Sequence, residues 1–221
     1  MANITHIEPL PEAVMPKSAS VRNHVVIPLH KLSGVDATFF TFDGLVDDKE
    51  HIAIGLGDFE HVDVPLVRLH SECLTGDVFE SQRCDCGAQL EEAIEKVKQA
   101  GGYILYLRQE GRGIGLYNKI DAYALQLEGY DTFEANQKLG FADDLRDFEV
   151  AAQMLHALKA DNIRLLSNNP NKVEQLRQYK VNVSEMVTTG AFISAGNHSY
   201  LKAKVVKANH QIDVPVKDSE A

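Results

Sequence analysis

Hydrophobic and polar positions along the chain change their period near residue 70. Before that point, short apolar runs at 24–29, 37–42, 51–54 and 64–69 are separated by turn-forming residues. These runs are rich in β-branched and aromatic residues, which predicts β-strands. The short connections between the first three runs predict an antiparallel meander.

After residue 70 the apolar residues recur at helical spacing. Leu90, Ile94 and Val97 lie on one face of a predicted helix over about 88–99, which two glycines close. A strand is predicted at 103–107. This part of the chain therefore alternates between helices and strands.

The alternation continues downstream. Helices are predicted through 120–127 and over about 143–159, followed by a strand at 163–166 and by Pro170 where a further helix begins. The predicted fold class is α/β with a mixed sheet, in which N-terminal antiparallel strands precede alternating strands and helices.

The chain is long enough for one core and a small appendage. Residues 1–20 carry prolines and mixed polar residues, which predicts a flexible arm, and residues 206–221 are low in apolar content and are expected to fray. Residues 21–205 are expected to form a single domain.

The net charge of −10 in 221 residues argues against a nucleic-acid polymer as partner, since such partners select basic surfaces. No apolar run approaches the roughly 20 residues of a membrane span, so no membrane partner is expected. The N-terminus does not resemble a secretory signal, and the cytoplasm is the expected location.

Three cysteines, an odd number, are crowded into one segment as Cys73, Cys84 and Cys86. In a reducing compartment such a cluster indicates metal ligands or reactive thiols rather than disulfides. Zinc favours thiolates, and its fourth ligand here is either a histidine, with His70 nearby, or a water. The first arrangement is structural and the second catalytic. Spacing alone leaves both open, and it also leaves open that the three cysteines are core thiols without a metal.

The segment 108–115, RQEGRGIG, runs from a predicted strand towards a predicted helix. Its glycines can bring backbone amides close to phosphate oxygens, and its arginines can bind them in a bidentate way. The alternative is a tight turn with arginines facing solvent. Residues 167–170 are similarly either an anion-binding helix start or an ordinary cap.

These segments occur in an order that resembles one enzyme family. From Val64 to about Lys172 the chain is similar to GTP cyclohydrolase II, the enzyme that opens riboflavin biosynthesis. The segments that carry the resemblance are 68–77, 83–87, 108–115, 122–126, 129–132 and 168–170.

The resemblance implies a catalytic zinc held by Cys73, Cys84 and Cys86, with water as the remaining ligand. It implies hydrolysis of GTP at carbon 8 of guanine, with release of formate and pyrophosphate to give a diaminopyrimidine ribosyl phosphate. Magnesium is expected to assist at the triphosphate.

The resemblance also implies roles for individual residues. Tyr123 is expected near the ring-opening step, Asp144 as an acid–base group, and Arg146 as a nucleophile or a charge clamp. A homodimer is expected by resemblance. The GTP contacts map to Arg68, Leu69, His70, Ser71, Glu72, Gln89, Glu110, Gly111, Arg112, Thr132, Ser167 and Lys172.

Two positions depart from the family pattern. Ser167 stands where threonine is common, and Asp121 stands where arginine is common, which reverses a charge near the predicted site. Two alternatives therefore stand beside complete hydrolysis. One is a variant that opens the ring but stops at the formamide, and the other is a non-catalytic regulator that binds zinc and nucleotide.

Overall fold

A single seven-stranded sheet forms the centre of the protein in the computed structural model, which describes residues 13–29, 35–142, 144–190 and 192. The strand order is β1-β2-β3-β5-β4-β6-β7. The strands are β1 Ser20–Leu29, β2 Val35–Asp43, β3 Ile52–Leu56, β4 Leu66–Ser71, β5 Gly102–Leu107, β6 Asn162–Leu166 and β7 Asn182–Val187.

The sheet has two halves of different direction that meet at β5. Strands β1, β2, β3 and β5 pair antiparallel, whereas β5, β4, β6 and β7 pair parallel. The α/β class and the antiparallel N-terminal strands predicted from the sequence are confirmed. The predicted strand at 64–69 does not extend the meander, because β5 lies between it and β3.

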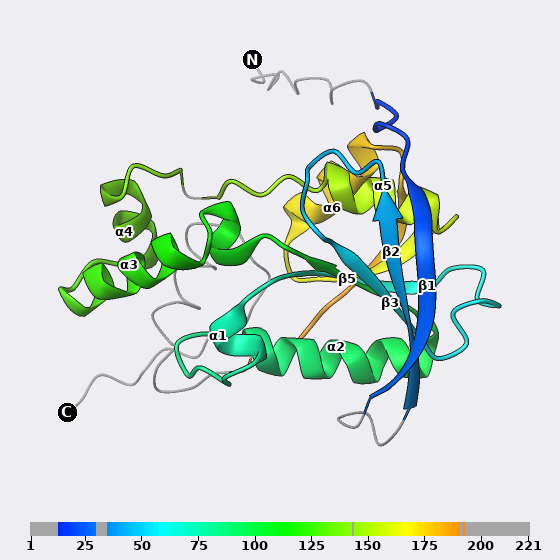
Figure 1. Ribbon diagram of the computed structural model, residues 1–221, viewed down its shortest axis with the longest axis horizontal. Helices are drawn as coiled ribbons and strands as arrows, with labels where there is room; N and C mark the ends of the chain where they lie inside the picture. Colours follow the sequence, from blue (N-terminus) through cyan, green and yellow to red (C-terminus); the bar gives the residue numbers. More distant parts are fainter. Residues whose placement is uncertain (1–12, 30–34, 143, 191, 193–221) are drawn as a thin grey trace, which may run out of the picture.

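Helices cover both faces of the sheet, and two more project from one side of it (Figure 1). The helices are α1 Leu74–Asp77, α2 Cys86–Ala100, α3 Leu116–Leu127, α4 Thr132–Lys138, α5 Glu149–Ala157 and α6 Pro170–Gln178, with a 3-10 turn η2 at Glu110–Gly113. No helix among the described residues is long and apolar enough to cross a membrane.

Alternation along the strands supplies a core on each face. Ile104 of β5 packs with Ala93 and Val97 of α2 on one face. Leu105, the next residue, packs with Met154 and the other apolar side chains of α5 on the opposite face. Successive side chains of a strand point to opposite faces, so one buried strand serves both cores.

The helix predicted over 143–159 begins later than the sequence indicates, and this prediction is wrong at its start. The helix α5 begins at Glu149. The amide of Leu145 donates to the carbonyl of Arg112, and that of Arg146 donates to the Asp144 side chain. These hydrogen bonds are not the backbone bonds of an α-helix, so the segment stays irregular. The irregular stretch ends at the turn in which the Asp147 side chain accepts from the Glu149 amide.

Several other sequence predictions concern the ends of elements. The helix at 88–99 is confirmed and begins at Cys86, and the helix start at Pro170 is confirmed. The predicted arm is described only from residue 13, where the Val14 amide donates to the carbonyl of Gln178. The tail at 206–221 lies outside the described residues.

A buried histidine ties the antiparallel half of the sheet to the end of β5. The His51 side chain is fully buried, its Nε2 lies 2.9 Å from Asp47 Oδ1, and its Nδ1 accepts from the Arg108 amide at 2.9 Å. This pattern requires a neutral ring protonated at Nε2. Burial, which outweighs the attraction of Asp47, lowers the pKa of His51 below 6.5.

We expect His51→Gln to lose more stability at neutral than at acidic pH. The pKa of His51 is lower in the folded than in the unfolded chain, so protonation favours unfolding. The stability that the neutral His51 contributes is therefore present above pH 6.5 and lost as pH falls below it. Urea unfolding should show a loss of about 1–3 kcal/mol at about pH 7.5 that shrinks towards about pH 5.

His61→Gln provides the control. The hydrogen bond from His61 to Asp58 raises the pKa of His61, so any contribution of this exposed residue is lost as pH rises. A loss in His51→Gln that does not change with pH would contradict the assignment of a neutral, buried His51.

Candidate active site

The carboxyl ends of three parallel strands meet at one edge of the sheet. Chain segments leave there after Ser71 of β4, Leu107 of β5 and Leu166 of β6. The amide of Glu72 donates to the carbonyl of Leu107 at 2.8 Å, which holds the first two segments side by side. Open α/β sheets bind ligands at this edge, and a pocket lies there.

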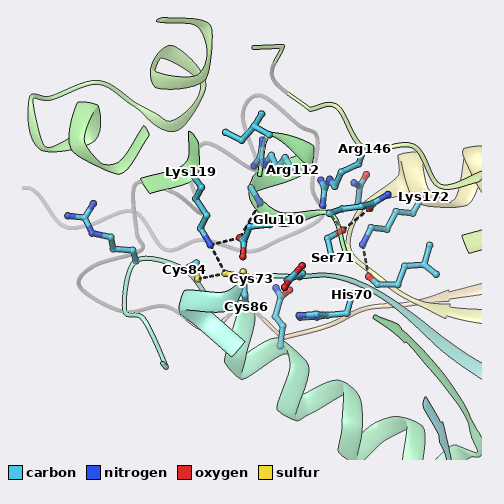
Figure 2. A pocket seen from close by; sticks show the side chains of 18 of the residues that line it. His70, Ser71, Cys73, Cys84, Cys86, Glu110, Arg112, Lys119, Arg146 and Lys172 are labelled. Carbon is cyan, nitrogen blue, oxygen red and sulfur yellow. Dashed lines mark hydrogen bonds and ion pairs between the residues drawn. The ribbon is translucent and has the colours of Figure 1, made fainter. Parts of the chain in front are cut away.

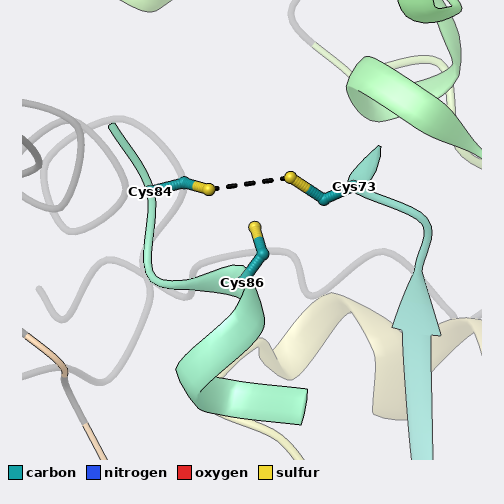
Figure 3. A group of neighbouring side chains, drawn as sticks. All are labelled: Cys73, Cys84 and Cys86. Carbon is teal, nitrogen blue, oxygen red and sulfur yellow. Dashed lines mark hydrogen bonds between the residues drawn. The ribbon is translucent and has the colours of Figure 1, made fainter. Parts of the chain in front are cut away.

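The three cysteines come together beside this pocket. Cys73 follows β4, Cys84 lies in the loop after α1, and Cys86 begins α2, with the three sulfur atoms turned towards one another (Figure 3). All three sulfurs lie within 4.8 Å of one another, and those of Cys73 and Cys84 are 3.6 Å apart. Tetrahedral zinc with Zn–S bonds of about 2.3 Å places sulfurs about 3.8 Å apart, so the cluster fits zinc.

Gly76 of α1 and Gly87 of α2 allow these two helices to approach each other beside the cysteines. A Cβ on Gly76 would lie 2.9 Å from the Cys84 sulfur and 3.0 Å from the Cys73 sulfur, and a Cβ on Gly87 would lie 2.4 Å from the carbonyl oxygen of Gly76. The sulfur cluster therefore depends on the absence of a side chain at position 76.

The thiols share their protons unequally. Hydrogen bonds with Cys84 and Cys86 hold the pKa of Cys73 far below its usual range, against the effect of burial. The same interaction with Cys73 raises the pKa of Cys84 to about 11. A cation that binds thiolates would displace the remaining protons.

His70 does not join the sulfur cluster. Its Nε2 lies 3.0 Å from Asp77 Oδ1, and Asp77 Oδ2 also accepts from the Cys73 amide and the Tyr106 hydroxyl. Asp77 therefore holds both the histidine and the turn that carries Cys73. In the described part of the chain, the group of possible metal ligands contains the three cysteines and no histidine.

The glycine-rich segment, residues 108–115, lines the pocket with one of its two arginines. Gly111 and Arg112 both have left-handed backbone conformations, with φ of 61° and 60°. Such a conformation is strained for arginine and is typical of functional turns. Arg112 lines the pocket, whereas Arg108 is half exposed and pairs with Glu72 at 3.0 Å.

Arg112, Arg146 and Lys172 lie on the side of the pocket away from the cysteines, whereas Lys119 lies against them (Figure 2). Lys172 is buried and donates to the Leu69 carbonyl at 2.8 Å. Arg146 donates through Nε to Asp144 Oδ1 at 2.8 Å and reaches Ser71 Oγ at 3.4 Å. Burial acts to raise the pKa of Asp144, but its hydrogen bonds with Arg146 outweigh this and lower it.

Most residues predicted from the sequence line this pocket. Asp144 does not line it but is hydrogen-bonded to Arg146, and the structure describes Thr132 only as the first backbone position of α4. Asp121 is exposed and is also outside the lining. The predicted residues that line the pocket are Arg68, Leu69, His70, Ser71, Glu72, Cys73, Cys84, Cys86, Gln89, Glu110, Gly111, Arg112, Tyr123, Arg146, Ser167 and Lys172.

Lys119 lines the pocket and is buried, but it was not predicted from the sequence. It lies one helical turn before Tyr123 on α3, and residues four apart share a helix face. That spacing was the available signal. Asp77 and Arg83 were also missed, and the Arg83 guanidinium lies 5.2 Å from the centre of the Tyr123 ring.

Comparisons with known proteins agree with this geometry. The family model of GTP cyclohydrolase II matches residues 24–188. The GTP cyclohydrolase-2 of Vibrio vulnificus is 57% identical over 197 residues, which is 89% of this chain and all of that protein. That of Vibrio cholerae is 56% identical over 88% of this chain and 98% of its own length.

A longer relative matches as well. The riboflavin biosynthesis protein RibBA of Bacillus cereus is 51% identical over 174 residues, which is 78% of this chain and 44% of that protein. The chain is thus a hydrolase with an α/β fold and a three-cysteine pocket. It belongs to the GTP cyclohydrolase II family.

We expect Gly76→Ala to weaken zinc binding about tenfold or more. The added methyl group displaces at least one sulfur, because two of them lie within 3.0 Å of its position. Competition with a chromophoric chelator measures the affinity. Gly55→Ala is the matched control, since its methyl meets the Phe59 ring at 2.9 Å in β3, away from the cysteines. Equal zinc affinity in the two variants would contradict the assignment of the three sulfurs as the metal ligands.

Proposed function

We propose that this enzyme hydrolyses GTP, opens the imidazole ring of guanine, and releases formate and pyrophosphate to give a diaminopyrimidine ribosyl phosphate. The observation that carries the proposal is one pocket with two chemically different sides. Three thiol ligands lie on one side, and the basic groups of Arg112, Arg146 and Lys172 lie on the other (Figure 2). This arrangement suits a ligand with a reactive ring and a polyphosphate.

The metal is proposed to be zinc, held by Cys73, Cys84 and Cys86. When bound, zinc supplies Lewis-acid chemistry and lowers the pKa of water towards neutrality. His70 is hydrogen-bonded to Asp77, and no histidine of the described chain joins the sulfurs. Both observations support water as the fourth ligand.

Tyr123 is proposed to assist the opening of the ring. Burial raises the pKa of Tyr123 to about 12, so the phenol keeps its proton at neutral pH. Its side chain is held between the Thr75 hydroxyl, the Lys119 ammonium and the Arg83 guanidinium. A phenol in this position can donate a hydrogen bond or a proton to a ring nitrogen as the ring opens.

Arg146 is proposed to clamp the phosphates rather than to attack the α-phosphorus. Asp144, its partner, has a lowered pKa and is therefore a weak base for a guanidinium, which stays protonated. A charged, oriented guanidinium stabilises negative charge on departing pyrophosphate. Magnesium is proposed to assist at the same side of the pocket.

Two buried polar atoms also support a ligand in this pocket. Nε of Arg68 and Nδ1 of His70 are buried and have no hydrogen-bond partner among the described residues. Buried polar groups are normally paired, and both residues line the pocket. A bound nucleotide is proposed to supply the missing partners.

The guanine edge is proposed to be read by Glu72. Among the GTP contacts expected from the resemblance, Gln89 and Glu110 also carry an amide or a carboxylate that could read guanine. Both are engaged within the protein, since Gln89 bonds to Arg68 and Asp85, and Glu110 bonds to Lys119. The partner of Glu72 is the half-exposed Arg108, which can be released to solvent at small cost.

Incubation of the purified protein with GTP, zinc and magnesium tests the function directly. Formate and pyrophosphate should be released in equal amounts. Pyrophosphate without formate would indicate arrest at the formamide, and neither product would contradict GTP hydrolysis. Tyr123→Phe should lower formate release about a hundredfold, because it removes the acid–base group, while pyrophosphate release continues.

Asp121→Asn is the matched control on α3. Asp121 is exposed and outside the pocket, so both products should form at the rate of the unmodified enzyme. An equal loss of formate and pyrophosphate in Tyr123→Phe would contradict a role specific to the ring.

A homodimer that acts in the cytoplasm is the proposed working form. One exposed face of α3 supports it, because Tyr117, Ile120 and Leu127 follow helical spacing and are 84%, 47% and 76% exposed. Leu127→Glu should convert a dimer of the 24.5 kDa chain into monomer in sedimentation equilibrium. Val46→Glu, another exposed apolar position, is the control, and a monomeric unmodified protein would overturn the proposal.

A further inference from the structure

Lys119 places a buried positive charge against the sulfur cluster. Its ammonium lies 3.1 Å from the Cys73 sulfur, 3.1 Å from the Thr75 hydroxyl and 2.7 Å from Glu110 Oε1 (Figure 2). The residue is only 8% exposed. The proposed reaction described above gives it no role at the metal, only a place beside the Tyr123 ring.

Lys119 is held in this position by a carboxylate that is itself fixed. While Glu110 Oε1 receives the ammonium, its Oε2 accepts from the Leu74 amide at 2.7 Å. Leu74 is the residue after Cys73 and the first of α1. Glu110 therefore connects the lysine to the same turn that presents the Cys73 sulfur, and the distance between ammonium and sulfur is fixed from both sides.

The charge of the site explains why a cation is needed there. A zinc ion with three thiolates carries a net charge of −1, and a buried charge is costly unless it is compensated. A hydrogen bond from an ammonium to a thiolate stabilises the negative charge on sulfur. Such contacts outside the metal ligands orient the ligands and tune the metal.

A buried lysine–glutamate pair with a purely structural role is the simpler alternative. It would explain the 2.7 Å contact with Glu110 but not the direction of the other N–H donors of the Lys119 ammonium. Those donors point to the Cys73 sulfur and to Thr75, and the Lys119 ammonium also lies 5.7 Å from the centre of the Tyr123 ring. All three are neighbours of the metal site.

We infer that Lys119 is a positioning residue of the metal site: its ammonium donates to the Cys73 thiolate, fixes that sulfur, and partly neutralises the charge of the three-thiolate cluster. The inference rests on the proposed zinc site. It predicts that the lysine changes the properties of the bound metal, with or without GTP.

The test measures metal binding in Lys119→Met, which keeps the length of the side chain but removes its charge. Zinc affinity, from chelator competition without GTP, should fall about 10- to 100-fold. In the cobalt-substituted protein, the sulfur-to-cobalt charge-transfer band should move to longer wavelength, because a thiolate without its hydrogen bond gives up electron density more easily. Lys119→Arg, which keeps a charged donor, should recover part of both effects.

Lys96→Met is the matched control. Lys96 forms a lysine–glutamate pair of the same 2.7 Å length with Glu92, but it is half exposed and remote from the cysteines. Its zinc affinity and cobalt spectrum should equal those of the unmodified protein. The double variant Glu110→Gln/Lys119→Met, which leaves no unpaired buried carboxylate, replaces the single variant if that one does not fold.

Two results would overturn the inference. One is unchanged zinc affinity in a folded Lys119→Met or double variant. The other is weaker affinity with an unmoved cobalt band, which is the result expected of a structural ion pair. If the unmodified protein itself binds neither zinc nor cobalt through sulfur, the proposed metal site fails instead, and that outcome is visible before any variant is made.

Discussion

The parallel pairing of β4 with β5 is the contact on which the site depends. It runs from Leu66 against Gly102 to Ser71 against Leu107, and it ends both strands at the same edge. The turn with Cys73 and the turn with Glu110 consequently leave the sheet side by side. Because β5 also pairs antiparallel with β3, the buried ring of His51 can hold the Arg108 amide from the other side. The position of the glycine-rich segment is thus fixed by both halves of the sheet.

A second constraint is the concentration of charge in a buried pocket. Three thiols, Glu110, Lys119, Arg68 and Lys172 line the pocket, and each of these four charged side chains has a partner of opposite charge or a hydrogen bond. Asp77 orders the turn that carries Cys73, and Glu110 orders the Lys119 side chain. Such pairing keeps polar groups in place without bulk water. The proposed binding of a metal and a polyanion together would depend on this order.

Hydrophobic periodicity was sufficient to predict the α/β class, the antiparallel strands and most helices, because buried strands such as β5 and helices such as α2 have continuous apolar faces. It failed where tertiary contacts decide. The acidic residues before α5 are typical of a first helical turn, yet Asp144 binds Arg146 and the Leu145 amide binds Arg112, which keeps the segment irregular. The strand β7 was not predicted, since only Val183 within it is buried. The family resemblance pointed to most of the residues that line the pocket. Lys119 was not among them, because it contacts Cys73 across 46 positions of sequence and only its spacing of four from Tyr123 marks it locally.

We propose that three cysteines hold one zinc ion, with an open fourth position beside a surface that binds phosphates. X-ray absorption at the zinc edge of the purified, zinc-loaded protein measures the ligands of that ion. We expect one zinc per chain, with three sulfurs at about 2.3 Å and one oxygen at about 2.0 Å. A nitrogen shell with the multiple scattering of imidazole would contradict it, because it would place a histidine on the metal. A protein that retains no zinc, or zinc with fewer than three sulfurs, would contradict it as well.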